Sequence, residues 1–230
     1  MKCLMSWSGG KDSALALYRC LNSPKYSIVG LVTTISSSTN RISMHGVALD
    51  VLKNQTDSIG LPLHVITLPE DCSMDAYESI MGVFMSNMKR DGIKGVVFGD
   101  IFLEDIRAYR EKQMRGIGLI PIFPLWGLKS HDVANEFFAN HFKSIITCVD
   151  GELLDESFVG QNYTSAYIEK LPDGVDPCGE NGEFHSFVFA GPIFQRELEV
   201  KVVNTICREY PNPQGGNPKT FWFADIAISK

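Results

Sequence analysis

The sequence predicts an α/β protein that combines a doubly wound, parallel, Rossmann-like sheet with a smaller mixed α+β lobe at its C-terminal end. Over roughly the first 150 residues, short apolar runs alternate with segments of helical periodicity. Such alternation is typical of a parallel sheet with helices on both faces. From about residue 151 the helical pattern shortens and strand-like runs follow one another. We therefore expect two domains, at residues 1–150 and 151–230.

The first domain is expected to open with a strand at 2–6, a helix at 12–21 and a second strand at 26–34. The run at 26–34 is apolar and rich in β-branched residues, which favours a buried strand. Residues 46–59 place apolar side chains on a roughly helical stripe, and 63–68 form an apolar strand in front of a proline.

The alternation continues with a helix expected at 74–89, for which Ser73 is a candidate N-cap. The elements expected after it are a strand that ends in a glycine turn at 95–100 (GVVFGD), helices at 104–116 and 130–140, and a strand at 143–149.

The C-terminal lobe is expected to be mixed in structure. A short helical pattern lies at 165–171, and strand-like runs lie at 184–189, 196–204 and 220–228. The last run, TFWFADIAI, partly alternates apolar and polar residues, as an antiparallel strand would.

Composition limits the classes of function. The chain carries 27 acidic and 21 basic residues, a formal net charge of −6. This disfavours a nucleic-acid partner, which needs a basic surface. No apolar run is long enough to cross a bilayer, so no membrane partner is expected. Six scattered cysteines without a CxxC pair fit a reducing compartment, which predicts a cytoplasmic location.

The glycine pair in MSWSGGKDS, residues 5–13, stands between a predicted strand and a predicted helix. The start of a helix exposes unpaired N–H groups and the positive end of its dipole, which together attract anions. Gly9 and Gly10 would let the backbone approach a phosphate closely, and Ser8 and Ser13 would add hydroxyl groups. The alternative interpretation is an ordinary glycine turn.

Two charged residues in this loop need separate explanations. Asp12 would repel a phosphate unless Mg²⁺ lay between them, since this ion bridges carboxylates to phosphates. Asp12 could instead serve only to begin the helix. Lys11 could reach a phosphate or remain in solvent.

The string SGGKDS resembles the PP-loop of the ATP pyrophosphatases, which cleave ATP between the α and β phosphates. The resemblance implies an adenine-nucleotide α-hydrolase-like fold, ATP and Mg²⁺ as cofactors, and transfer of AMP to a substrate oxygen. The segments VVFGDI (followed by Arg107 and Glu111), LIPIFPLWG, LDESFVGQ and GVDPCGENGEFHSFVFAGPIF resemble, in that order, the diphthine–ammonia ligase family. The similarity runs from residue 1 to about 195, and CGENGEFHSF is typical of a prokaryotic-type relative.

This resemblance implies an amide-forming ligase. ATP would adenylate a substrate carboxylate, pyrophosphate would leave, and ammonia would displace AMP. The carboxylate would belong to a modified histidine on elongation factor 2 if the source is archaeal or eukaryotic, and to another compound otherwise. Asp12, Glu180 and Glu183 are then expected to be catalytic, and His185 to contact substrate. On composition alone, the loop with both glutamates could be a solvated turn.

Other polar residues allow two interpretations each. Asp100 follows a strand and would bind metal or substrate, or cap the next helix. Arg107 would contact an anionic substrate, or form a surface salt bridge with Glu111. His45 would contact substrate, or lie in a mobile loop.

Thr33 and Thr34 would flank the adenine, or pack as ordinary β-branched strand residues. Cys178 could act as a nucleophile, although a small packed loop residue fits its surroundings better.

Two other functions stay open at this point. A PP-loop tRNA-thiolating enzyme would need a basic RNA-binding face and often cysteine pairs, and a non-catalytic nucleotide sensor would bind without turnover. The source of ammonia and the oligomeric state are also open, with a homodimer as one candidate.

Overall fold

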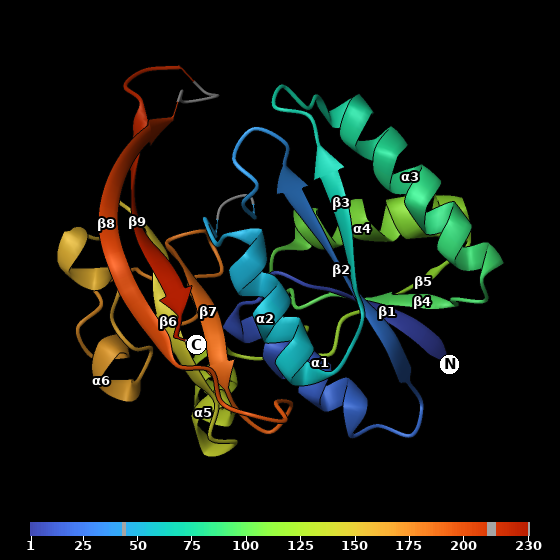
Figure 1. Cartoon of the computed structure of the whole chain (residues 1–230), viewed down its shortest axis with the longest axis horizontal. Coiled ribbons are helices and arrows are strands. Elements are labelled where there is room, and N and C mark those ends of the chain that lie inside the picture. Colours follow the sequence, from blue (N-terminus) through green and yellow to red (C-terminus); the bar gives the residue numbers. More distant parts are fainter. Residues whose placement is uncertain (43–44, 211–214, 230) are drawn as a thin grey trace.

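The structure, a computed structural model, describes residues 1–42, 45–210 and 215–229. Its first sheet has five parallel strands in the order β3-β2-β1-β4-β5 (Figure 1). These strands are β1 (Lys2–Ser6), β2 (Ser27–Ser36), β3 (Leu63–Leu68), β4 (Gly95–Val97) and β5 (Ile120–Ile122). The parallel, doubly wound sheet predicted from the sequence is confirmed.

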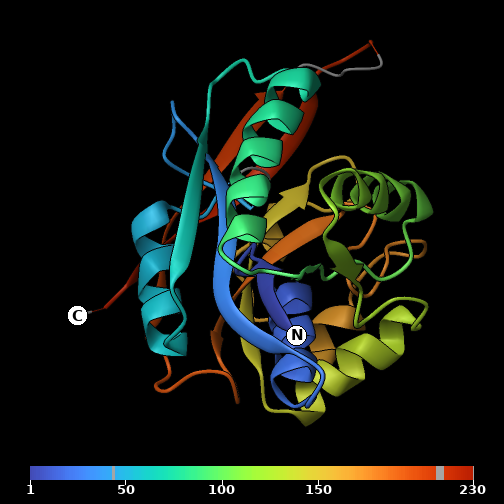
Figure 2. The same ribbon diagram turned by 90° about the vertical axis from the view of Figure 1, so that its right-hand side faces the viewer.

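Helices cover both faces of this sheet. They are α1 (Lys11–Leu21), α2 (Leu49–Ile59), α3 (Met74–Arg90), α4 (Glu104–Ile117) and α5 (Ser130–Ala139). Helices α1 and α2 lie between the two sheets, where α1 contacts β7 and α2 contacts β9. Helices α3 and α4 pack on the opposite face (Figure 2). The alternation along β1 fits this arrangement, because Met5 joins the core of the α1/α2 side and Leu4 joins the core of the α3/α4 side.

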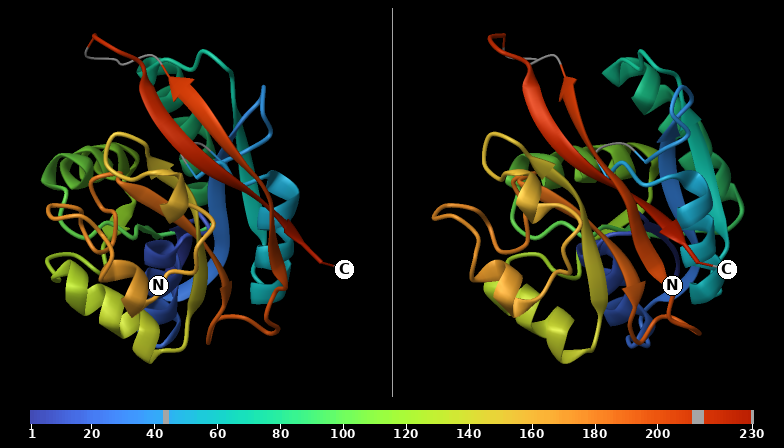
Figure 3. Two further views of the ribbon diagram at one scale, coloured as in Figure 1. Left: turned by 90° about the vertical axis from the view of Figure 1, so that its left-hand side faces the viewer. Right: turned by 60° about the vertical axis from the view of Figure 1, so that its left-hand side comes forward.

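The second sheet is antiparallel and has the order β7-β6-β9-β8 (Figure 3). Its strands are β6 (Lys143–Asp150), β7 (Phe184–Ala190), β8 (Val200–Tyr210) and β9 (Lys219–Ile228), with short helices η1 (Glu156–Phe158) and α6 (Ser165–Ile168) between β6 and β7. This sheet confirms the smaller C-terminal lobe.

The sequence analysis placed one strand in the wrong sheet and missed another. The strand expected at 143–149 forms as β6, but it pairs with β7 and β9 instead of joining the parallel sheet. The antiparallel sheet therefore begins at Lys143, and a domain boundary at residue 150 stays a prediction. The sequence analysis also missed β5, a three-residue strand with a proline at its centre.

The order of the parallel strands determines where a ligand can bind. The chain winds outward from β1 to β2 and β3, and then returns to place β4 on the other side of β1. At such a switch point the loops after the two central strands separate and leave a crevice at the carboxyl edge. Here these loops follow β1 and β4, so the glycine pair and Asp100 meet at this crevice.

Candidate active site

The glycine loop turns sharply between β1 and α1. Gly9 has φ +79°, and a Cβ atom there would lie 2.9 Å from Leu52 Cδ1, so both backbone conformation and space require glycine. Gly10 occupies the N-cap of α1 without a side-chain cap. The Gly10 N–H donates to Ser8 Oγ at 3.2 Å, and Ser13 Oγ donates to the Gly10 carbonyl at 2.8 Å. The two serine hydroxyls therefore face the start of α1, where a phosphate would bind.

Residues far along the chain hold this loop. The Lys11 N–H donates to Ser186 Oγ at 3.2 Å, and the Val188 N–H donates to the Gly9 carbonyl at 2.9 Å. Gln55, which is fully buried, donates through Nε2 to the carbonyls of Gly9 and Val188. The loop is thus fixed jointly by α2 and β7.

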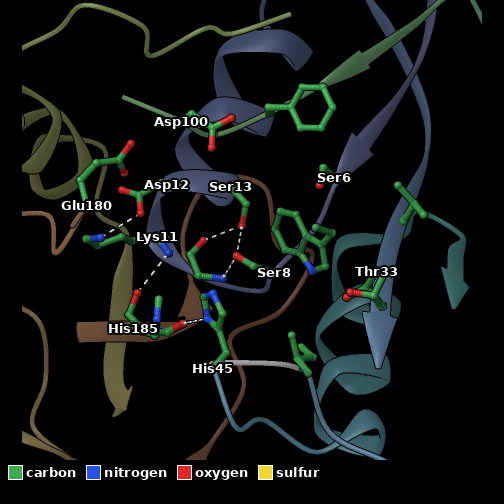
Figure 4. Close-up of a pocket in the computed structure, with 18 of the residues that line it drawn as sticks. Ser6, Ser8, Lys11, Asp12, Ser13, Thr33, His45, Asp100, Glu180 and His185 are labelled. Carbon is green, nitrogen blue, oxygen red and sulfur yellow. Dashed lines mark hydrogen bonds and ion pairs between the residues drawn. The ribbon is translucent and has the colours of Figure 1, made fainter. Parts of the chain in front are cut away.

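A pocket of about 390 Å³ opens beside the loop (Figure 4). Its walls come from the ends of β1, β2 and β4, from α3 and α4, and from the loop that leads into β7. Most of the predicted site residues line it: Ser8, Gly10, Lys11, Asp12, Ser13, Thr33, Thr34, His45, Asp100, Glu180 and His185. The structure therefore brings together residues from position 8 to position 185.

Lys11 and Asp12 form a buried ion pair in this pocket. The ammonium Nζ lies 2.9 Å from Asp12 Oδ2 and also donates to the Cys178 carbonyl. Only 4% of the Lys11 side chain is exposed. Burial favours the neutral amine, but the charge and hydrogen bond of Asp12 oppose this effect, and the net result is a raised pKa of Lys11. Lys11 therefore stays charged, and its contacts link the glycine loop to the loop before β7.

Asp12 uses one of its two oxygens in that pair. The other, Oδ1, is buried and has no hydrogen-bond partner among the described residues. Burial raises the pKa of Asp12, and Lys11 opposes this shift. A buried carboxylate oxygen without a partner at the edge of a pocket fits a cation ligand better than a purely structural role.

Glu180 reaches the pocket from the second lobe. Its Oε1 accepts from the Ile101 N–H at 2.7 Å and lies 3.4 Å from the Phe102 nitrogen. Burial, reinforced by the charge of Asp12, raises the pKa of Glu180 to about 7. The carboxyl group therefore exchanges a proton near neutral pH, as a general acid or base must.

The imidazole rings of His45 and His185 lie against each other in the pocket, with ring centroids 4.5 Å apart. His45 Nδ1 lies 3.3 Å from the Ser186 carbonyl oxygen. Burial lowers the pKa of His45 to about 4 and lowers that of His185 well below its ordinary value. Both rings are therefore neutral at pH 7, and each can offer a nitrogen to a ligand without adding charge.

Three predicted residues lie outside the pocket lining. Gly9 belongs to the loop but packs against α2 and β7 on the side away from the pocket lining. Glu183 is buried, and its Oε1 accepts from the Asp176 N–H at 3.0 Å and from Asn181 Nδ2 at 2.9 Å, so it holds its own loop in shape. Arg107 pairs with Glu111 on the same helix, as the surface interpretation expected. The catalytic role of Glu183 and the substrate contact of Arg107 stay predictions.

The structure adds residues that the sequence analysis missed. Arg110 lines the pocket and forms an ion pair with Asp100. Ser186 also lines the pocket, and its Oγ accepts a hydrogen bond from the Lys11 N–H. Tyr77 and Phe98 add aromatic surface. The only signal for Arg110 in the sequence was its position three residues after Arg107, which places both on neighbouring positions of one helix.

Cys178 is a packed residue and not an activated nucleophile. Its thiol is buried and donates to the Ser130 carbonyl at 3.3 Å. Burial raises the pKa of Cys178 to about 12, against the nearby charge of Lys11, so almost no thiolate exists at neutral pH.

A magnesium site was also predicted, at Asp12 and Asp100. Within residues 1–42, 45–210 and 215–229, no three His, Cys, Asp or Glu side chains are arranged to hold a metal. Mg²⁺ beside a nucleotide needs only one or two carboxylates, because phosphate oxygens and water complete its coordination. The unpartnered Asp12 Oδ1 fits such a site, while Asp100 is engaged by Arg110.

The fold and this pocket define the class of α/β proteins that carry a glycine-rich loop and a ligand crevice at the switch point of a parallel sheet. Within that class, the chain belongs to the diphthamide synthase family: residues 1–121 match its N-terminal domain and residues 129–224 match its C-terminal domain.

Curated relatives agree with this family. The chain is 26% identical over 218 residues to a rat (Rattus norvegicus) protein named diphthine–ammonia ligase, covering 84% of this chain and 80% of the relative. A mouse (Mus musculus) protein of the same name is 25% identical over the same length and coverage.

A solved structure described as a predicted tRNA methyltransferase subunit from Methanocaldococcus jannaschii has a TM-score of 0.40 and 16% identity, covering 65% of this chain and 78% of the other. This likeness carries no argument. Among the described residues, no helix is both long and apolar enough to cross a membrane.

Proposed function

We propose that this protein is an ATP-dependent ligase that activates a substrate carboxylate as an acyl-adenylate and converts it to an amide with ammonia. The observation that carries the proposal is the placement of Glu180 in the same pocket as the SGGKDS loop. Membership of the diphthamide synthase family and the name diphthine–ammonia ligase of its relatives support the reaction class. Diphthine on elongation factor 2 is the first carboxylate to test.

The loop supplies the groups that bind the phosphates. N–H groups at the start of α1 and the hydroxyls of Ser8 and Ser13 would contact their oxygens. Mg²⁺ held by Asp12 and the phosphates would screen the repulsion between the substrate carboxylate and the triphosphate. Thr33 and Thr34, in the C-terminal half of β2, would lie beside the adenine.

The first step forms one bond and breaks one. A carboxylate oxygen of the substrate attacks the α-phosphorus of ATP, and the bond from that phosphorus to the bridging oxygen breaks. Pyrophosphate leaves with the electron pair, and the carboxyl carbon then carries AMP as a leaving group. Donors fixed around the phosphates stabilise the charge that develops there.

In the second step ammonia attacks the carboxyl carbon and AMP departs with the electrons of the carbon–oxygen bond. The nitrogen must lose a proton to become an amide. Glu180 is the base we assign to this transfer, because its pKa of about 7 leaves a large fraction ionised at neutral pH. The neutral rings of His45 and His185 would orient the ammonia or the acyl group.

The test is incubation of the protein with α-labelled ATP, Mg²⁺, ammonium and elongation factor 2 that carries diphthine, with a set of small carboxylates in parallel. We expect labelled AMP and free pyrophosphate that depend on the carboxylate. Formation of ADP would remove the proposed reaction class. Binding of total tRNA in a gel shift, with AMP release that depends on tRNA, would favour a tRNA-modifying enzyme instead.

A pair of glutamate variants makes the test specific. Glu180→Gln keeps an oxygen for the Ile101 N–H but cannot accept a proton, so AMP release should fall about 100-fold or more. Glu183 is the other glutamate predicted to be catalytic, so the two variants together show which carboxylate takes the proton. Because Glu183 does not line the pocket, we expect Glu183→Gln to retain most turnover. Equal losses would contradict the assignment of Glu180.

A cytoplasmic location stays a prediction.

A further inference from the structure

Arg110 on α4 lines the pocket, and the proposed reaction gives it no role. Its Nε lies 2.7 Å from Asp100 Oδ2, and its Nη2 donates to Asp100 Oδ1 at 3.1 Å. The guanidinium also lies over the Phe98 ring, 4.6 Å from the centroid. A carboxylate on one edge and an aromatic ring on one face fix the orientation of the group.

This fixed guanidinium still has donors to offer. Arginine carries five N–H donors, and Asp100 engages at most two of them. No other residue in the described part of the chain accepts a hydrogen bond from Arg110. Since the side chain lines the pocket and is 31% exposed, the remaining donors are available to a ligand. Paired N–H groups in a plane match an oxyanion such as phosphate or carboxylate.

The charges in the pocket also favour Arg110 as a group that binds an anion. The described lining of the pocket contains three acidic residues, Asp12, Asp100 and Glu180. Apart from histidines, its basic residues are Lys11 and Arg110. Lys11 is buried and already bonded to Asp12 and the Cys178 carbonyl. A bound triphosphate would bring further negative charge, and Arg110 is the cation with donors left for it.

The position of Asp100 shows which part of a nucleotide Arg110 would reach. The residue before it, Gly99, packs against the first turn of α1: a Cβ atom there would lie 3.0 Å from the Ser13 nitrogen. Asp100 and its partner Arg110 are therefore neighbours of the helix start at which phosphates bind.

We propose that Arg110 binds the outer phosphoryl oxygens of ATP and holds the pyrophosphate as it leaves. This assignment rests on the proposed function for the identity of the nucleotide, and it adds a residue that neither the loop sequence nor the family resemblance indicated. Arg110 and the start of α1 then form two sides of one phosphate site, and Asp100 and Phe98 position the guanidinium.

The test is calorimetric titration of the wild-type protein and two variants with inorganic pyrophosphate, ATP and AMP, each with Mg²⁺. Arg110→Gln should weaken pyrophosphate and ATP about 10-fold or more, as expected for loss of hydrogen bonds to a charged group. AMP, which lacks the outer phosphates, should bind as it does to wild type and so reports that the pocket is intact. Arg110→Lys keeps the charge but not the fork of donors, and it should fall between.

Arg107→Gln is the matched control. Arg107 lies on the same helix, is 35% exposed, pairs with Glu111 at 2.8 Å and lies 4.5 Å from the centroid of the Trp126 ring, but it is outside the pocket lining. The contact predicted for Arg107 is with the substrate that ATP would activate, which is absent from these titrations. This variant should therefore bind all three ligands as wild type does.

Three outcomes would overturn the proposal: unchanged pyrophosphate binding by Arg110→Gln, an equal loss for AMP, or an equal loss in Arg107→Gln. These titrations involve no turnover. A protein that shows the expected pattern but forms no AMP from ATP would therefore refute the ligase reaction and leave the role of Arg110 standing.

Discussion

Replacing Glu180 with glutamine should make the folded protein more stable at alkaline pH while it strongly lowers turnover. Burial and the charge of Asp12 raise the pKa of Glu180 from 4.5 to about 7. Since one pKa unit corresponds to about 1.4 kcal/mol, ionising this group in the folded state costs up to about 3 kcal/mol. The amide side chain of the Glu180→Gln variant would carry no charge and would keep an acceptor for the Ile101 N–H.

The sign of the pH dependence follows from the direction of the shift. Below pH 4.5 the carboxyl group is protonated in both the folded and the unfolded chain, so wild type and Glu180→Gln should be equally stable. Between pH 4.5 and 7 the unfolded chain ionises first, and the free energy of unfolding of wild type falls relative to the variant. Above pH 7 the difference should be constant and at its largest.

The measurement is urea unfolding of both proteins at pH 5 and pH 8, followed by circular dichroism, with the slopes compared to confirm the same two-state transition. Glu183→Gln is the control. In wild type the Glu183 carboxylate accepts hydrogen bonds from the Asp176 N–H and from Asn181 Nδ2, and these bonds weaken when the acceptor becomes a neutral amide. The variant should therefore be less stable than wild type by about 1 kcal/mol. A Glu180→Gln protein that is less stable than wild type at pH 8, or whose advantage is the same at both pH values, would refute the reasoning.

Three further predictions test the loop and its surroundings. Asp12→Asn keeps an oxygen that can accept a hydrogen bond from Lys11 but loses the negative charge, so Mg²⁺ should no longer strengthen ATP binding in calorimetry; undiminished strengthening would exclude Asp12 as a metal ligand. Gly9→Ala should lower the free energy of unfolding by about 1–3 kcal/mol, because φ is +79° and the new Cβ would lie 2.9 Å from Leu52; an unchanged urea midpoint would count against this. With a thiol reagent at pH 7, the buried Cys178 should react far more slowly than the exposed Cys207 and the half-buried Cys72. The double variant Cys72→Ser/Cys207→Ser should therefore lose the fast phase, and a fast phase that disappears only when Cys178→Ser is added would show an accessible Cys178.

Much of the fold could be predicted because its elements carry strong local patterns. The bounds of β1 and β3 coincide with the predicted runs at 2–6 and 63–68. The partners of a strand depend on segments far away in the chain, and this explains why β6 was recognised as a strand but placed in the wrong sheet. The short β5 has too few residues to show any periodicity.

The site shows the same limit. The SGGKDS loop could be recognised because its chemistry lies within six consecutive residues. Arg107 and Arg110 look alike in sequence, as two arginines on one helix with acidic residues nearby. Their difference appears only in three dimensions: the carboxylate partner of Arg107 is Glu111 on its own helix, whereas that of Arg110 is Asp100 in the pocket.

The contact between the Lys11 N–H and Ser186 Oγ joins residues 175 positions apart. A chain leaving the ribosome cannot complete the contacts of the glycine loop until residue 186 has emerged. By then β1 to β6 have already been synthesised. Contacts of such long sequence separation form late and slowly during folding. A newly made molecule would therefore gain its secondary structure first and the proposed nucleotide site last, and added ATP would favour this final step.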